Sequence, residues 1–341
     1  MSSPLSRSLF FSLVFLGLTA CGGGGGSSTS ATSQSVPPPP PPPPPSTEFG
    51  IRGAAFKGLL KGANVYVYSA DELFDDNPVV IGSSSTSTFT GNFSVTVDTA
   101  NKNIGDNVVV AVVMKNATME CDAPNGCAPG IGFEDDFELP KENISDESRL
   151  VDPFFMAAII PTPALGTRAE ITVNMFTHMQ IVYYNSLLSS TSFPNERALL
   201  SRAQTRIANM FGLIDQNFTE LGFIDLTGSF NGDIRSNDLK ASILSGGIQG
   251  ALGEDGQAID DVYFDFLSDF VNQDGEILIN EGNQDSTATI SLQDIYDNAI
   301  AIENINSSSA NVFGSVLQSL KDERVRINNA ASFSQTENGN Y

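Results

Sequence analysis

Tryptophan is absent from this chain of 341 residues, and histidine occurs once, as His178. Without tryptophan the chain lacks the most common stacking platform for sugar rings, and phenylalanine and leucine have to fill its cores. A structural zinc site needs four histidine or cysteine ligands, and the chain offers one histidine and no second cysteine pair. The sequence therefore disfavours zinc, and it contains a single side chain whose ordinary pKa lies near neutrality.

Positive charge is also scarce. The chain has 17 lysines and arginines against 40 aspartates and glutamates, which gives a formal net charge of -23. A surface this acidic repels phosphate backbones and anionic lipid headgroups, so we expect no nucleic acid partner. Acidic side chains can attract divalent cations, but they also keep a folded surface hydrated. We expect the second effect here.

The apolar run near the N-terminus is too short to span a membrane. It covers Leu9–Leu18, contains Ser12 as its only polar side chain, and follows Arg7. A membrane-spanning helix needs roughly 20 apolar residues, whereas the core of a secretory signal needs about 7 to 15. We therefore interpret residues 1–20 as a signal peptide.

The run ends in the motif Leu18-Thr19-Ala20-Cys21, which resembles the lipobox of bacterial lipoproteins. The resemblance implies that Cys21 becomes the lipidated N-terminus, for instance with palmitate, and anchors the protein in a membrane. In that family an aspartate after the cysteine is usual for retention at the inner membrane. Gly22 stands here instead, which implies the outer membrane, facing the periplasm or the cell surface. A plain cleaved signal is the alternative.

Low-complexity sequence follows Cys21. Five glycines lead into serine and threonine, and nine prolines run from Pro37 to Pro45. Glycine and serine form flexible coil, while the proline run favours polyproline II at about 3.1 Å per residue. Residues 21–47 are predicted to form a disordered tether with one stiff section. A ligand for SH3-type domains is the alternative, but such partners are mainly intracellular.

The other two cysteines, Cys121 and Cys127, enclose a short stretch with turn-forming proline, asparagine and glycine. In an oxidising compartment a pair this close in sequence is typical of a disulfide that closes a loop. We predict a disulfide between Cys121 and Cys127.

From Glu48 the apolar pattern has a period of two residues, which is typical of strands. One continuous apolar run indicates a strand buried on both faces. Short strands separated by glycine, asparagine and aspartate turns predict a β-sandwich over residues 48–175. The predicted strands are Ala63–Tyr68, Phe89–Val97, Val108–Met114 and Glu170–Val173.

The stretches Gly53–Tyr68 and Thr90–Val95 resemble the carboxypeptidase regulatory-like domain of the transthyretin-like type. That family combines a first strand, a "G-x-P-L-x-G-A-x-V" turn and a "T-x-x-x-G-x-F" turn, and this chain has Leu59 where proline is common. The resemblance implies a seven-stranded sandwich and a non-catalytic role as a spacer or adhesion module.

Residues 127–167 combine acidic side chains with repeated prolines, among them Pro140, Pro153, Pro161 and Pro163. Proline cannot donate to a ladder of hydrogen bonds, so we expect irregular structure there, with neither a central strand nor a long helix. The cluster Glu134–Asp136 is expected to be a solvated loop, and calcium binding through its oxygens is the alternative.

From about Thr177 the apolar spacing becomes helical, in six amphipathic stretches that must bury their stripes on one another. This predicts an α-helical domain over residues 176–330, followed by a flexible tail over residues 331–341. Helix boundaries are expected at Asn195 and Gly212, at Asp238 as a cap, and at Ser291 with Asp294 as a capping box.

Candidate catalytic residues are few. His178 lies where the strand pattern gives way to a helix, a place more typical of packing or capping than of catalysis. No "G-x-S-x-G" motif surrounds any serine. Carboxylate pairs such as Asp260 with Asp261, or Glu134 with Asp136, fit glycoside hydrolysis, but pairs are common among 40 acidic residues. We predict no enzymatic activity; the rival, a hydrolase, requires His178 exposed in a cleft.

The best candidate metal site is a calcium loop. With Phe270 as its first position, the stretch follows the EF-hand pattern "D-x-[DN]-x-[DN]-G-x5-E" except at that position, where phenylalanine cannot bind a cation. A turn between two helices also accounts for the Asp274-Gly275 pair. The residues that would hold calcium are Asp269, Asn272, Asp274 and Glu281.

The sequence predicts an α+β chain with an N-terminal sandwich of the transthyretin or immunoglobulin-like kind and an all-α domain. The whole resembles Gram-negative lipoproteins of uncharacterised function. We expect a non-catalytic binding or structural module of the cell envelope. A surface adhesin or carbohydrate-binding accessory protein is the alternative. Its protein or carbohydrate ligand would meet a pocket or exposed aromatic patch made from Tyr66, Tyr68 or Phe89.

Overall fold

The structure is a computed structural model. Contacts divide the chain into residues 1–44 and a compact unit over residues 45–341. The predicted signal peptide, Cys21 and the tether up to residue 45 lie outside the described residues. The structure describes residues 46–56, 59–72, 78–100, 102, 104–114, 117–122, 136–138, 155–190, 195–222, 224, 226, 234–253, 259–277, 290–302 and 310–338.

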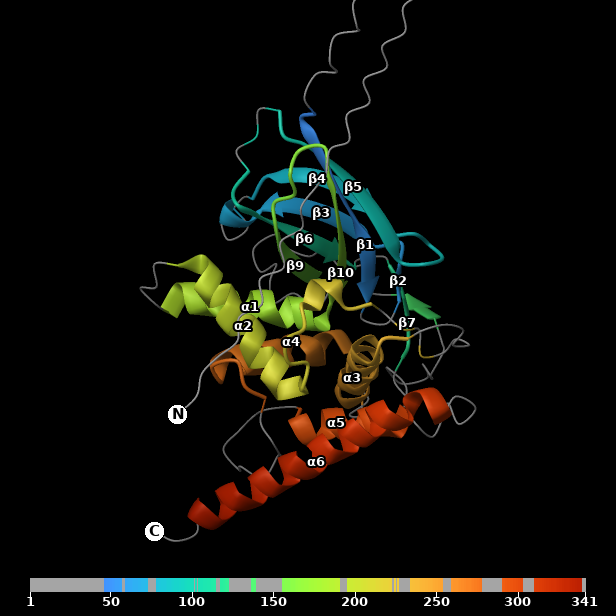
Figure 1. The fold of residues 1–341 in the computed structure, drawn as a ribbon, viewed down its shortest axis with the longest axis vertical. Helices are drawn as coiled ribbons and strands as arrows, with labels where there is room; N and C mark the ends of the chain where they lie inside the picture. The colour runs from blue at the N-terminus through green and yellow to red at the C-terminus, as the bar shows by residue number, and fades with distance from the viewer. Residues whose placement is uncertain are drawn as a thin grey trace, which may run out of the picture. The chain divides into compact units, whose positions relative to one another are not determined.

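Strands precede helices along the chain, so the mixed α+β class is confirmed (Figure 1). The strands are β1 (Glu48–Phe56), β2 (Leu60–Lys61), β3 (Asn64–Ser69), β4 (Val80–Ser85), β5 (Asn92–Asp98), β6 (Asn107–Val113), β7 (Thr118–Glu120), β8 (Asp136–Glu138), β9 (Phe155–Pro161) and β10 (Arg168–Asn174). The helices are η1 (Ala70–Glu72), α1 (Met175–Ser190), α2 (Glu196–Phe211), η3 (Phe218–Glu220), α3 (Ser236–Gly253), α4 (Ile259–Asn272), α5 (Leu292–Ala301) and α6 (Ala310–Asn338).

The strands form three sheets, with orders β10-β1-β5, β4-β3-β6-β9 and β2-β7-β8. In the first sheet β1 is the central strand. It pairs antiparallel with β5 and parallel with β10, although β10 lies more than a hundred residues further along the chain. This parallel pair brings the first strand of the unit beside the strand that leads directly into α1.

The predicted strands in this half are confirmed with small shifts. β3 and β6 are each shifted by one residue from the predicted strands, and Val108–Val112 is buried at every position, as expected for a strand covered on both faces. The strand expected from Phe89 begins only at Asn92. Residues 88–90 form a turn instead, which reaches Gly91 with a backbone φ of +62°.

The prediction of irregular structure over residues 127–167 is wrong for residues 155–161. There β9 pairs with β6 along seven residues, and six of its residues are buried. The apolar run Phe155–Ile160 supplies the strand. Its proline, Pro161, occupies the last position of a strand at the edge of the sheet, where a missing N–H costs little. The acidic stretch also contributes a short strand, β8.

Helix α1 is the centre of the helical part, because it contacts β9, β10, α2 and α4. The sequence predicts an amphipathic helix with one apolar stripe. Instead nearly every residue of α1 is buried, from Met175 to Tyr184, because the sheet covers one side and helices the other. Buried residues of the sheets and of the helices belong to one continuous hydrophobic core.

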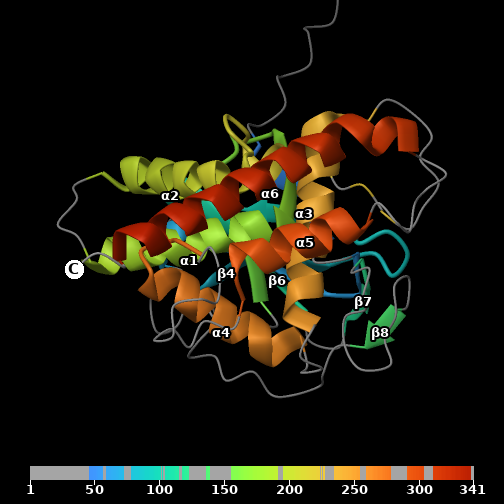
Figure 2. The ribbon, with the colours of Figure 1, turned by 90° about the horizontal axis from the view of Figure 1, so that it is seen from below.

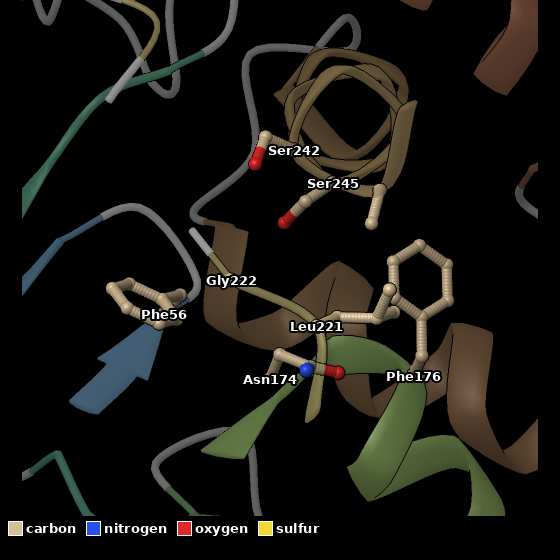
Figure 3. A pocket seen from close by; sticks show the side chains of 8 residues that line it. Phe56, Asn174, Phe176, Leu221, Gly222, Ser242 and Ser245 are labelled. Carbon is tan, nitrogen blue, oxygen red and sulfur yellow. The ribbon is translucent and has the colours of Figure 1, made fainter. Parts of the chain in front are cut away.

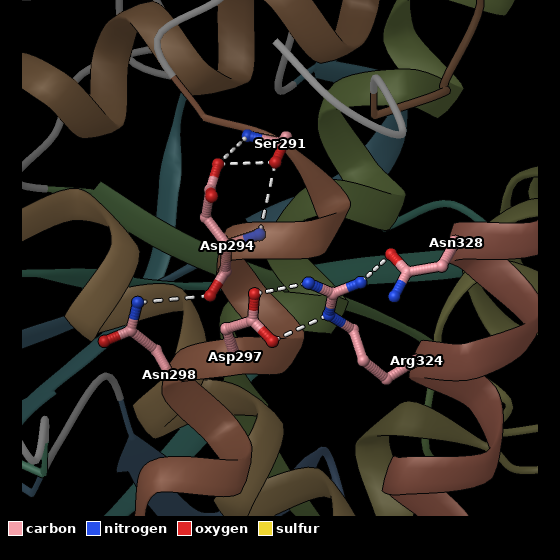
Figure 4. A network of polar contacts seen from close by, with 6 residues as sticks. All are labelled: Ser291, Asp294, Asp297, Asn298, Arg324 and Asn328. Atoms are coloured by element: carbon pink, nitrogen blue, oxygen red, sulfur yellow. Dashed lines mark hydrogen bonds and ion pairs between the residues drawn. The ribbon is translucent and has the colours of Figure 1, made fainter. Parts of the chain in front are cut away.

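The expected ends of α2 and α5 are confirmed. Asn195 accepts a hydrogen bond from the Ala198 N–H, and Gly212 closes α2 in the left-handed region at φ 60°. Ser291 and Asp294 form the capping box of α5 (Figure 4). The expectation that Asp238 caps α3 is wrong, because α3 begins at Ser236 and Asp238 lies within its first turn.

Helix α3 packs closely on α5, as Figure 2 shows. Glycines make this approach possible. A Cβ added at Gly247 would lie 2.5 Å from the Ile295 carbonyl oxygen and 2.8 Å from Ala299 Cβ. At Gly250 it would meet the Asn298 side chain, whose Oδ1 would be 2.5 Å away. These glycines therefore set the distance between the two helices.

Helix α6 is held by apolar and ionic contacts. Val316, Leu317 and Leu320 are buried, and α6 contacts α5 and α3. Arg324 donates to both carboxylate oxygens of Asp297 on α5 (Figure 4).

A more deeply buried ion pair joins α6 to α3. Lys240 Nζ lies 2.6 Å from Glu323 Oε1, and the exposed fractions of the two side chains are 8% and 18%. Tyr296 donates a 2.8 Å hydrogen bond to the other Glu323 oxygen. Helix α6 continues to Asn338, through most of the residues expected as a tail.

Candidate functional site

A groove with a volume of about 630 Å³, lined by both polar and apolar residues, lies on the outer face of the sheet β10-β1-β5. Because side chains alternate along a strand, its floor comes from every second residue of neighbouring strands. Arg52 and Ala54 of β1 pair in register with Glu170 and Thr172 of β10, and Asn92 of β5 adds an amide beside Ala54. The floor therefore carries donors and acceptors on a rigid scaffold.

The short helix η3 and residues 221–222 form one wall of this groove. Strand β10 holds the wall from one side. Thr172 Oγ1 lies 2.8 Å from the Leu221 carbonyl oxygen, and the Asn174 amide donates to the Phe218 carbonyl oxygen at 3.0 Å. Helix α3 holds it from the other side, because Asp238 Oδ1 accepts a 2.9 Å hydrogen bond from the Gly222 N–H. A wall fixed on both sides keeps the groove in shape.

The charges around the groove are mixed, unlike those of the chain as a whole. Arg52 and Glu170 form an ion pair across the floor, with exposed side-chain fractions of 52% and 68%. Arg235 donates to the Glu220 carbonyl oxygen and to Asp238, 2.6 Å from its Nε. Glu220 also lines the groove, and its carboxylate accepts a 2.8 Å hydrogen bond from the Asn217 amide. A groove with charges of both signs and a further carboxylate suits a neutral, hydroxyl-rich or amide-rich ligand better than an anion.

A small cavity of about 20 Å³ adjoins the groove (Figure 3). Leu221 and Gly222 line both spaces. The two strands that supply the floor of the groove, β1 and β10, also reach the cavity. Their last residues, Phe56 and Asn174, line it. The remaining lining residues are Phe176, Ala241, Ser242 and Ser245.

The predicted calcium frame takes the form of a helix end. The Gly275 N–H donates to the Phe270 carbonyl and the Asp274 N–H to the Val271 carbonyl, the pattern of a Schellman motif. Asp274 has a φ of 55°. Phe270, the first position of the frame, is buried against Tyr183.

The carboxylate of Asp274 already has partners. Tyr183 donates to its Oδ1 at 2.9 Å, and Arg202 lies 3.7 Å from its Oδ2. Burial and this hydrogen bond raise the pKa of Tyr183. Glu281 lies outside the described residues, and the described part of the chain contains no cluster of three His, Cys, Asp or Glu residues suited to a metal. Calcium binding through Asp269, Asn272, Asp274 and Glu281 stays a prediction.

His178 is fully buried in α1, between the rings of Phe155 and Tyr263 at centroid distances of 5.9 and 6.1 Å. The hydrolase alternative requires this side chain in an exposed cleft, and the structure places it in the core. Asp260 and Asp261 lie on α4, and Asp136 lies on β8.

Cys121 is buried, and Cys127 lies outside the described residues, so their disulfide stays a prediction. The aromatic residues expected of an adhesin do not form one exposed patch. Phe89 is 84% exposed on its turn, whereas Tyr68 is 4% exposed, and Tyr66 is only half-buried beside it.

The groove residues were not among the candidates that the sequence offers. Asn92, Glu170 and Thr172 occupy outward positions of predicted strands, which is where polar residues of any half-buried sheet occur, and Arg52 lies on β1, which is not among the predicted strands. The alternation of apolar and polar residues could have indicated the outward face of the sheet, but no sequence signal places η3 beside β10.

The chain matches no protein-family model, no curated protein and no solved structure.

Proposed function

We propose that this chain is a lipid-anchored binding module of the cell envelope that holds a neutral polar ligand in the groove on the sheet β10-β1-β5. The groove itself carries this proposal, because its volume of about 630 Å³ is that of a typical ligand site and its walls are fixed by hydrogen bonds. The proposed action is binding without catalysis.

The location is supported by the sequence. The resemblance of Leu18–Cys21 to a lipobox, the charge at Arg7 and the low-complexity segment after Cys21 agree with an exported lipoprotein. Gly22 favours the outer membrane, where the tether would hold the folded unit away from the lipid. Within the described residues, no helix combines the length and apolarity that crossing a membrane requires.

We further propose that the sheets β10-β1-β5 and β4-β3-β6-β9 form a sandwich of the transthyretin-like type. Close contact between β4 and β5 supports face-to-face packing: a Cβ at Gly82 would lie 2.9 Å from the side chains of both Val95 and Val97. The parallel pairing of β1 with β10 is the feature that a solved relative would have to share.

The anchor is tested by intact mass and membrane fractionation of the native protein beside Cys21→Ser. We expect a lipid mass on the wild type and its recovery with outer membranes, and a soluble, unmodified variant. Two soluble, unmodified proteins would overturn the proposed location, leaving the groove to be judged separately.

The groove is tested with a matched pair of substitutions on β5. Asn92→Trp places a large side chain in the groove, whereas Thr96→Trp adds the same side chain at an exposed position of the same strand outside it. The full-length protein in detergent would be screened by thermal shift against neutral oligosaccharides and peptides. We expect stabilisation of wild type and Thr96→Trp but not of Asn92→Trp. An equal response of both variants would refute the groove as the site.

A further inference from the structure

The cavity beside the groove combines apolar side chains with the polar groups of Asn174, Ser242 and Ser245. Phe56, Phe176 and Leu221 provide carbon surface, and a volume of about 20 Å³ accommodates roughly one group of the size of a water molecule or a methyl. In Figure 3 the Leu221 side chain points toward Phe176, and Gly222 adds no side chain at the boundary with the groove.

The polar residues of the cavity differ in how far they are engaged. Ser242 accepts from the Ile224 N–H and donates to the Asp238 carbonyl oxygen. Asn174 accepts from the Thr177 N–H and donates to the Phe218 carbonyl oxygen. Among the described residues the Ser245 hydroxyl donates to a weak acceptor, Met175 Sδ at 3.5 Å, so it can turn toward a better one.

An acetamido group has the two features that this cavity would satisfy: a methyl for the apolar side chains and a carbonyl oxygen for the Ser245 hydroxyl. We infer that the ligand class is an oligosaccharide of N-acetylated amino sugars, with sugar hydroxyls on the groove and the methyl of one acetamido group in the cavity. This inference depends on the proposed function of the groove.

The composition of the site agrees with such a ligand. The groove floor has no exposed aromatic ring, since Phe93 is only 5% exposed, so a sugar would find its apolar contact in the cavity instead. A neutral sugar also avoids the repulsion that a chain with a net charge of -23 exerts on anionic polymers.

Titration calorimetry with chitotetraose and cellotetraose tests the inference, because these neutral sugars differ in the acetamido or hydroxyl group at carbon 2. Burial of the methyl and one neutral hydrogen bond contribute about fivefold each. We expect the full-length protein to bind chitotetraose roughly twentyfold more tightly.

Variants at Ser245 of α3 test whether the preference for chitotetraose over cellotetraose arises in the cavity. Ser245→Ala removes the donor and is expected to weaken chitotetraose binding about fivefold while leaving cellotetraose unchanged. Ser245→Leu fills the cavity and is expected to abolish the preference. Ser201→Ala, an exposed serine of α2, is the matched control and should change neither affinity. Circular dichroism of each variant verifies folding, and Ser245→Ala alone decides if Ser245→Leu fails to fold.

Equal binding of both sugars, or an unchanged preference in Ser245→Ala, would overturn the acetamido subsite while the groove stands. Binding of neither sugar also overturns it. The proposed function then fails as well only if the screen with Asn92→Trp and Thr96→Trp reveals no groove ligand. If the cavity holds only a water molecule, the protein should bind chitotetraose and cellotetraose equally.

Discussion

Replacing Gly247 by alanine should destabilise the protein, although alanine is the better helix former. An ordinary Gly→Ala change inside a helix gains about 1 kcal/mol from propensity. At Gly247 the new Cβ would lie 2.5 Å from the main-chain oxygen of Ile295 and 2.8 Å from Ala299 Cβ. A main-chain atom cannot turn away as a side chain can, so α5 as a whole would have to move.

Overpacking of this kind costs about 1–3 kcal/mol. Because the contact is with a main-chain atom, we expect a cost in the upper part of this range, so that Gly247→Ala lowers the free energy of unfolding by about 1–2 kcal/mol after the gain in propensity. The matched control is Gly314→Ala on α6, where an added Cβ meets nothing within 4 Å. That variant should gain about 0.5–1 kcal/mol.

Thermal and urea denaturation of the two variants beside the wild type measure the difference. In a compact unit as large as residues 45–341 each kcal/mol shifts Tm by roughly 2 °C, so the two shifts should be measurable and opposite in sign. A rise in Tm for Gly247→Ala equal to that for Gly314→Ala would refute the close packing of α3 on α5.

Three further predictions concern ionic, phenolic and thiol groups. Glu323→Ala leaves the buried Lys240 without its carboxylate and should cost about 3 kcal/mol in urea denaturation, whereas a Glu323→Asp variant should lose less. Burial, reinforced by nearby carboxylates, raises the pKa of Tyr184 to about 12. Because the unfolded tyrosine ionises first, near pH 10, stability should fall as the pH rises from 10 to 12, and Tyr184→Phe should reduce that fall in parallel denaturation curves. Alkylation with and without reductant should show Cys121 and Cys127 protected until reduced, and replacing both by alanine should cost about 2 kcal/mol; alkylation without reductant would refute the disulfide.

Most elements of the fold follow from local patterns. Period-two alternation gives β3 and β5, a continuous apolar run gives β6, and capping residues fix the ends of α2 and α5. Strand β9 escaped prediction because Pro153 and Pro161 around it suggested irregular structure, whereas proline at the end of an edge strand is compatible with pairing.

Long-range arrangement could not be predicted from these patterns. Nothing local in Gly50–Phe56 indicates a parallel partner at residues 168–174, and nothing in Phe218–Glu220 indicates that Thr172 and Asn174 hold it. The groove depends on both contacts. His178 shows the reverse case, because its position at the start of a helix was predicted while its burial between two rings depends on elements distant in sequence.

The central position of β1 has a mechanical consequence. Under the proposed anchoring at Cys21, any force between the membrane and a bound ligand enters the folded unit at Glu48, the first residue of β1. This strand is hydrogen-bonded on both sides, to β5 and to β10, so a pull along it loads two ladders in shear rather than opening them one bond at a time. The groove lies on the same three strands. Tension between tether and ligand would thus pass through this sheet and through the groove wall that η3 and α3 hold.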